Sequence, residues 1–84
     1  RMTVFDYKIV TKNTVTVITL SGKLNKESLE QLENCRKDLA QDSASVMILF
    51  FKDVPNVDPV VFRELTLLQQ EIRKKKGEPF RDRA

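Results

Sequence analysis

Apolar and polar residues alternate in the first quarter of the chain, which is typical of strands. Within residues 4–10, every second residue from Phe5 to Ile9 is apolar and the residues between are charged, which predicts a half-buried strand. Residues 14–20 are rich in Val, Ile and Thr and predict a second strand. Asn13, which tolerates a positive φ, lies between the two segments, so they are predicted to form a hairpin.

The pattern then changes to that of an amphipathic helix, predicted over residues 26–41. Gly22 follows the second strand, and Asn25 stands where its side chain can cap the helix. We interpret Cys35 as a small core residue rather than a reactive thiol. The apolar stripe of this helix is predicted to consist of Leu29, Leu32, Cys35 or Arg36, and Leu39.

The longest apolar run, Val46–Phe51, predicts a third strand. Because the run has no polar face, we expect it to be covered on both sides and to lie inside a sheet. A polar loop follows, and Asp58 and Pro59 then fit the cap and the first position of a second helix. This helix is predicted to end at Gly77, after the cationic run 73–76. Its stripe against the sheet is predicted to be Val61, Leu65, Leu68 and Ile72.

The order of elements is therefore β-β-α-β-α, which predicts an α/β fold with a mixed sheet. The strand–helix–strand segment implies a parallel pair with a right-handed crossover, and both helices are expected on one face. The 84 residues allow one domain, with a core over residues 3–77 and a polar tail over residues 78–84. A further strand is expected after the second helix, but the tail is too polar to supply it. The sheet is then expected to end on an unpaired edge.

Composition argues against several classes of function. The chain has no histidine, so imidazole-based triads and histidine-ligated zinc sites are excluded, and its two glycines are too far apart for a phosphate-binding loop. Asp53 and Asp58 are too few and too separated for a metal site. Fifteen cations and twelve anions are intermixed, so nothing indicates nucleic-acid binding. We expect no enzyme activity and no cofactor. A single cysteine suits the cytoplasm, and no segment is long and apolar enough to span a membrane.

Two motifs stand in order along this pattern: Leu20–Asn25 (LSGKLN) at the end of a strand, and Val54–Asp58 (VPNVD) before a helix. With them, the chain from about residue 4 to residue 77 resembles a STAS domain, the module of anti-sigma factor antagonists and of sulfate-transporter tails. The resemblance implies a coil of β-α turns that continues with another strand and helix, both missing here. Three explanations are open: the chain is cut, the natural protein is short, or a second chain completes the sheet.

The chain departs from the family at its phosphorylation switch. The resemblance implies a phosphorylatable serine or threonine directly after the aspartate, but Asp58 is followed by Pro59, Val60 and Val61. None of these residues carries a hydroxyl group, so the acceptor is absent. We therefore expect a domain that is fixed in a state equivalent to the unphosphorylated one.

The resemblance implies a non-catalytic, cytoplasmic interaction domain of a bacterial regulatory system, without the phosphoswitch and acting in transcription regulation. The expected partner is an anti-sigma-factor kinase-like protein, and any membrane contact would be made through a partner. A homodimer through the open sheet edge is a further expectation. The alternatives are an accessory domain of membrane transport or lipid trafficking, and a nucleotide-binding sensor. A neighbouring transporter gene would favour the transport role, whereas a neighbouring kinase or sigma-factor gene would favour the regulatory role. The predicted partner-binding residues are Asn25, Asp53, Asn56, Asp58, Pro59, Val60 and Arg63.

Overall fold

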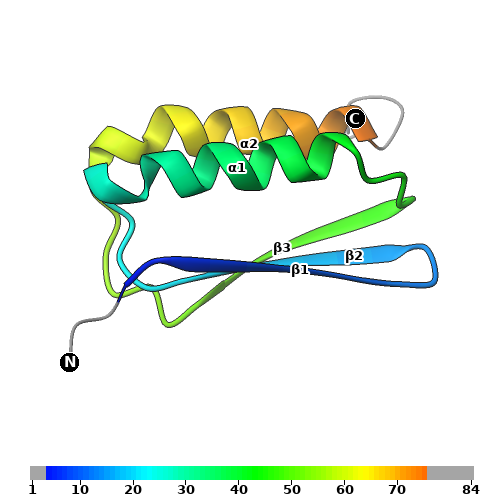
Figure 1. Cartoon of the computed structure of the whole chain (residues 1–84), viewed down its shortest axis with the longest axis horizontal. Coiled ribbons are helices and arrows are strands. Elements are labelled where there is room, and N and C mark those ends of the chain that lie inside the picture. Colours follow the sequence, from blue (N-terminus) through cyan, green and yellow to red (C-terminus); the bar gives the residue numbers. More distant parts are fainter. Residues whose placement is uncertain (1–3, 76–84) are drawn as a thin grey trace, which may run out of the picture.

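The computed structural model describes residues 4–75, which form a three-stranded sheet with two helices packed over one face (Figure 1). The order β-β-α-β-α and the mixed sheet confirm the predicted α/β fold. The strands are β1 (Asp6–Lys12), β2 (Val15–Ser21) and β3 (Val46–Lys52). The helices are α1 (Leu29–Ala40) and α2 (Phe62–Lys75), each preceded by a turn of 3₁₀ helix, η1 (Lys26–Ser28) and η2 (Pro59–Val61).

The central strand of the sheet is β2, which pairs antiparallel with β1 and parallel with β3. The register places Ile9 beside Ile18, and Ile18 beside Leu49. Between β1 and β2, Asn13 has a φ of 60°, as expected of an asparagine in a hairpin turn. The crossover through α1 returns the chain to the start of β2, on the side away from β1. Therefore β3 runs parallel to β2, and both strands finish at the same end of the sheet.

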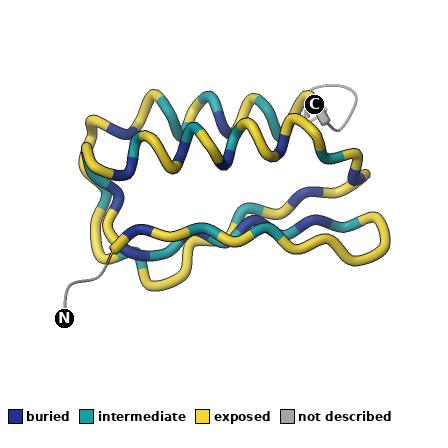
Figure 2. The backbone as a smooth tube through the Cα atoms, in the orientation of Figure 1, coloured by how far each residue is buried: buried dark blue, intermediate teal, exposed yellow. Residues whose placement is uncertain are grey.

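The core lies between the helix layer and one face of the sheet, and Figure 2 shows the buried positions facing inward along both helices. The sheet contributes Ile18 and Leu20, each with no exposed surface. Both predicted helical stripes are confirmed, although Leu29, Leu65 and Ile72 are only partly buried. The fully buried members of the two stripes are Leu32 (1% exposed), Cys35, Leu39, Val61 and Leu68.

The prediction that Val46–Phe51 is covered on both faces is wrong. β3 is the terminal strand of the three-stranded sheet, and only Met47 in it is buried. Ile48 and Phe50 lie on the face away from the helices, which no described element covers. Phe51 points toward α2 but is still 44% exposed, because α2 does not close over the edge of β3.

Both helices begin where the sequence predicts, but each first turn is tightened into a 3₁₀ turn. Three other predictions fall outside the described residues. They are the stop at Gly77, the polar tail 78–84 and the strand expected after the second helix.

Candidate functional site

Two loops meet at the end of the sheet where β2 and β3 finish, and each leads to the start of a helix (Figure 1). The first loop is 22–25 and the second is 53–58. Leu24 and Val57 form a parallel β-bridge, and the backbone N–H of Asp58 donates to the carbonyl of Leu24 at 2.9 Å. The N–H of Gly22 donates to the carbonyl of Asp53 at 3.2 Å. The two motifs on which the resemblance rests therefore lie side by side in the fold.

Left-handed backbone conformations at Gly22 and Asp53 allow this approach. Gly22 has a φ of 90°, and a Cβ atom there would collide with the backbone carbonyl of Val4, so no other residue fits without a shift of the chain. Asp53 has a φ of 53°, a conformation that aspartate tolerates better than most residues. Gly22 and Asp53 are themselves the donor and the acceptor of one of the hydrogen bonds that join the two loops.

Asn25 is half-buried, and its side chain is used within the fold. Its Oδ1 accepts the N–H of Glu27 at 3.0 Å, which confirms the predicted cap. The hydroxyl of the buried Ser28 accepts the N–H of Asn25 at 2.9 Å and donates to the carbonyl of Lys23 at 2.8 Å. These bonds fix the first loop from inside. A contact between Asn25 and a partner remains a prediction.

The start of the second helix presents an apolar surface to solvent. Asp58 Oδ1 accepts the N–H of Val60 at 2.9 Å, which confirms its role as the cap, and Pro59 occupies the first helical position. Val61 is fully buried and anchors the turn, while Val60 is 47% exposed. Arg63 lies about one helical turn beyond Pro59 and is exposed. Asp53, Asn56, Asp58 and Pro59 are exposed as well.

The structure thus gathers the predicted site into two adjacent loops and one helix start. Six of its seven members are exposed, and Asn25 is the half-buried one. Within residues 4–75 no three Cys, Asp or Glu side chains are grouped so that they could hold a metal ion. The surface offers shape, apolar contact and hydrogen-bonding groups, which suits recognition of another protein.

Cys35 lies in the core, away from these loops, and has no exposed surface. Burial, together with the charge of Asp38, raises the pKa of its thiol to about 12, so the thiol stays neutral and unreactive at ordinary pH. Nearby, the hydroxyl of Tyr7 donates to Asp38 Oδ2 at 2.8 Å, and burial with this hydrogen bond raises the pKa of Tyr7 to about 12. The hydrogen bond between Tyr7 and Asp38 joins β1 to α1.

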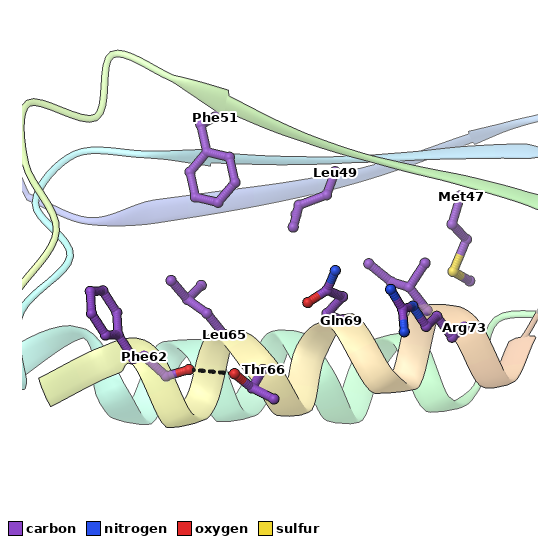
Figure 3. Close-up of a pocket in the computed structure, with 9 residues that line it drawn as sticks. Met47, Leu49, Phe51, Phe62, Leu65, Thr66, Gln69 and Arg73 are labelled. Atoms are coloured by element: carbon purple, nitrogen blue, oxygen red, sulfur yellow. Dashed lines mark hydrogen bonds between the residues drawn. The ribbon is translucent and has the colours of Figure 1, made fainter. Parts of the chain in front are cut away.

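An open groove between β3 and α2 is the feature that the sequence interpretation missed (Figure 3). Its volume is about 710 Å³. One residue in the sequence could have indicated this groove. Phe62 is aromatic and adjoins Val61, but it does not belong to the predicted stripe of the second helix. The strand contributes Met47, Leu49 and Phe51, and the helix contributes Phe62, Leu65 and Ile72.

Comparisons with known proteins leave the resemblance as a prediction. No family model matches the chain, and searches of curated proteins and of solved structures give no match either. Over the described part of the chain, none of the helices has the length and apolar character needed to cross a membrane.

Proposed function

We propose that this domain is a non-catalytic, STAS-like protein-interaction module of a bacterial regulatory system. In this role it acts in the cytoplasm as an anti-sigma factor antagonist-like regulator without the phosphoswitch. Its partner is an anti-sigma-factor kinase-like protein, and neither nucleic acid nor a cofactor takes part.

One observation carries the proposal: the loops 22–25 and 53–58, which hold both motifs of the resemblance, are joined by the Leu24–Val57 bridge and by the hydrogen bond from Asp58 to Leu24. Two motifs more than 25 residues apart in the chain thus form one surface. That surface includes the exposed Val60, supported from beneath by the buried Val61.

The contacts within this surface hold it in one shape before a partner binds. The Asp58 cap, the fixed φ of Pro59 and the backbone hydrogen bonds between the loops restrict the segment before any partner arrives. A surface that is already ordered loses less conformational entropy on association. Because no residue with a hydroxyl group directly follows Asp58, the partner would meet the same unphosphorylated surface at all times.

Affinity capture with matched variants tests the proposal. The chain serves as bait in a lysate of the organism that encodes it, as wild type, as Val60→Lys and as Val10→Lys. Val10 is 52% exposed and lies on β1, so its variant controls for the loss of an exposed valine elsewhere. Capture of an anti-sigma-factor kinase by the wild type and by Val10→Lys, with at least tenfold weaker binding by Val60→Lys, supports the proposal. Capture of a transporter or lipid-trafficking subunit instead, or equal binding by all three baits, refutes it.

A further inference from the structure

The free edge of β3 gathers most of the exposed apolar side chains of the described structure. Eight large hydrophobic residues are exposed, and five of them lie on β3 or at the facing start of α2. Neither proline nor a charged residue interrupts the edge between Val46 and Phe51, although these are the usual means by which proteins protect an edge strand. The five residues are Val46, Ile48, Phe50, Phe51 and Phe62.

We propose that a second copy of this chain pairs antiparallel along β3, with a two-fold axis at Leu49. The two three-stranded sheets would then form one continuous sheet of six strands. The proposal concerns self-association and is independent of the partner proposed for the loops 22–25 and 53–58.

The sequence of β3 is self-complementary about Leu49. Antiparallel pairing there sets Met47 opposite Phe51 of the second copy, and Ile48 opposite Phe50 of the second copy. Each pair joins residues of the same face: Met47 and Phe51 line the groove, whereas Ile48 and Phe50 face away from the helices. A shift of one residue would set groove residues against outward-facing ones and turn the second helix layer to the opposite face of the sheet.

The charges near the edge are compatible with this arrangement. In Figure 3, Arg73 lies beside Met47 and Phe62 lies toward the Phe51 end of the groove. The axis therefore brings Phe62 toward Arg73 of the second copy, an arrangement that favours a cation–π contact. The two Arg73 side chains stay at opposite ends of the interface, because Phe62 and Arg73 are about 16 Å apart along the helix. Lys52 likewise lies opposite Val46 of the second copy, so the two Lys52 side chains are also at opposite ends of the interface.

The apolar area at the edge suits a weak dimer. Phe50, Phe51 and Phe62 are 50%, 44% and 54% exposed, so together they offer about 300 Å² per chain. A standard interface buries about 800 Å² per partner. Val46, Ile48 and the main chain of the edge would add to the area that the aromatic side chains contribute. We expect a dissociation constant on the order of 1–100 μM. A segment of another protein could also add a strand here, but self-complementarity about Leu49 favours a second copy.

Sedimentation equilibrium of the 84-residue chain from about 1 μM to 1 mM tests the dimer. Ile48→Lys and Phe50→Lys each place a charge on the edge strand and should raise the dissociation constant at least tenfold. Val10→Lys makes the same change on the same face of the sheet, at the opposite edge strand, and should leave the dimer unchanged. Circular dichroism confirms that each variant is folded.

A cysteine at the axis tests the register. Leu49→Cys, in a chain that also carries Cys35→Ala, should form a disulfide-linked dimer on oxidation, because residues opposite each other in antiparallel strands are about 4.5–5.5 Å apart at Cα. Val10→Cys in the same background should not.

A wild-type chain that stays monomeric to about 1 mM overturns the proposal. So does a dimer that Val10→Lys dissolves as readily as Ile48→Lys does, since both side chains lie on the same face of the sheet and that pattern indicates stacking of sheet faces. Val60→Lys separates the two proposals, because it should weaken capture of the regulatory partner and leave the dimer intact.

Discussion

The backbone N–H of Asp58 donates to the carbonyl of Leu24 at 2.9 Å, and this bond joins the loop before α2 to the loop before α1. Both helices therefore start from one fixed point at the end of the sheet. The contact of η1 with η2 reinforces the link. The geometry of the candidate site thus depends on backbone contacts, and changes to the backbone should affect it more than changes to exposed side chains.

Gly22→Ala should destabilise the fold strongly. An alanine at a φ of 90° is strained, and its Cβ would meet the carbonyl of Val4, which is backbone and cannot move aside easily. We expect a loss of more than about 2 kcal/mol in the free energy of unfolding, measured by urea denaturation. The exposed neighbour Lys23 provides the control, since Lys23→Ala should change stability by less than about 0.5 kcal/mol. Equal effects of the two substitutions would show that Gly22 does not approach the backbone of Val4 as closely as described.

Leu68→Ala tests the packing of α2 on the sheet. Leu68 has no exposed surface and lies in the middle of the stripe, so truncation should cost about 2–5 kcal/mol. Gln70→Ala, at an exposed position of the same helix, should be nearly neutral. A loss under about 0.5 kcal/mol for Leu68→Ala would place this side chain on the surface and contradict the helix assignment.

Cys35 should make the domain less stable as the pH rises above about 9. Burial raises the pKa of this thiol to about 12 from an ordinary value of 9.0. Between these values the unfolded chain releases the proton and the folded chain keeps it, so the free energy of unfolding falls with rising pH, by at most about 1.4 kcal/mol per pH unit. The pKa of Tyr7 is raised from 10.0 to about 12 and acts in the same direction, more weakly because this side chain is only partly buried.

Urea denaturation of the wild type and of Cys35→Ala at pH 8 and pH 10 measures this effect. The wild type should lose on the order of 1 kcal/mol more than the variant over this interval. A thiol that reacts with an aromatic disulfide reagent as fast in the native protein as in urea would contradict the burial on which the prediction rests.

The sequence predicted the features that depend on local pattern. The stripe through Val61 and Leu68 follows from helical spacing, and the caps at Asn25 and Asp58 follow from the residues that adjoin them. The parallel pairing of the second and third strands was also predicted, from the strand–helix–strand order.

What the sequence did not predict depends on which elements are neighbours in space. The run Val46–Phe51 carries apolar residues on both faces, but a sequence pattern does not reveal that no other strand among residues 4–75 pairs with its outer edge. The groove beside Phe62 follows from the same missing neighbour. The approach of Gly22 to Val4 and the hydrogen bond of Gly22 to Asp53 likewise join residues that are far apart in the sequence.

Pro59→Ser tests the loss of the phosphorylation switch. Thr66 is the only residue with a hydroxyl group from Asp53 to Thr66, and its hydroxyl donates to the carbonyl of Phe62 at 3.0 Å. The wild type should therefore remain unmodified in this segment after incubation with its partner kinase. Serine is acceptable in a first helical turn capped by Asp58, so the substitution should cost about 0.5–1 kcal/mol through the freer unfolded chain.

The Pro59→Ser chain should gain one phosphate from a related kinase, and mass spectrometry of the intact protein detects it. Pro59→Ala is the matched control, because it makes the same change to the backbone without supplying a hydroxyl group, and it should stay unmodified. A phosphate added at the helix start would place about two negative charges beside Val60, and capture of the regulatory partner by Pro59→Ser should then fall on phosphorylation. A stoichiometric phosphate on Thr66 of the wild type would show instead that the domain keeps a switch at a different hydroxyl.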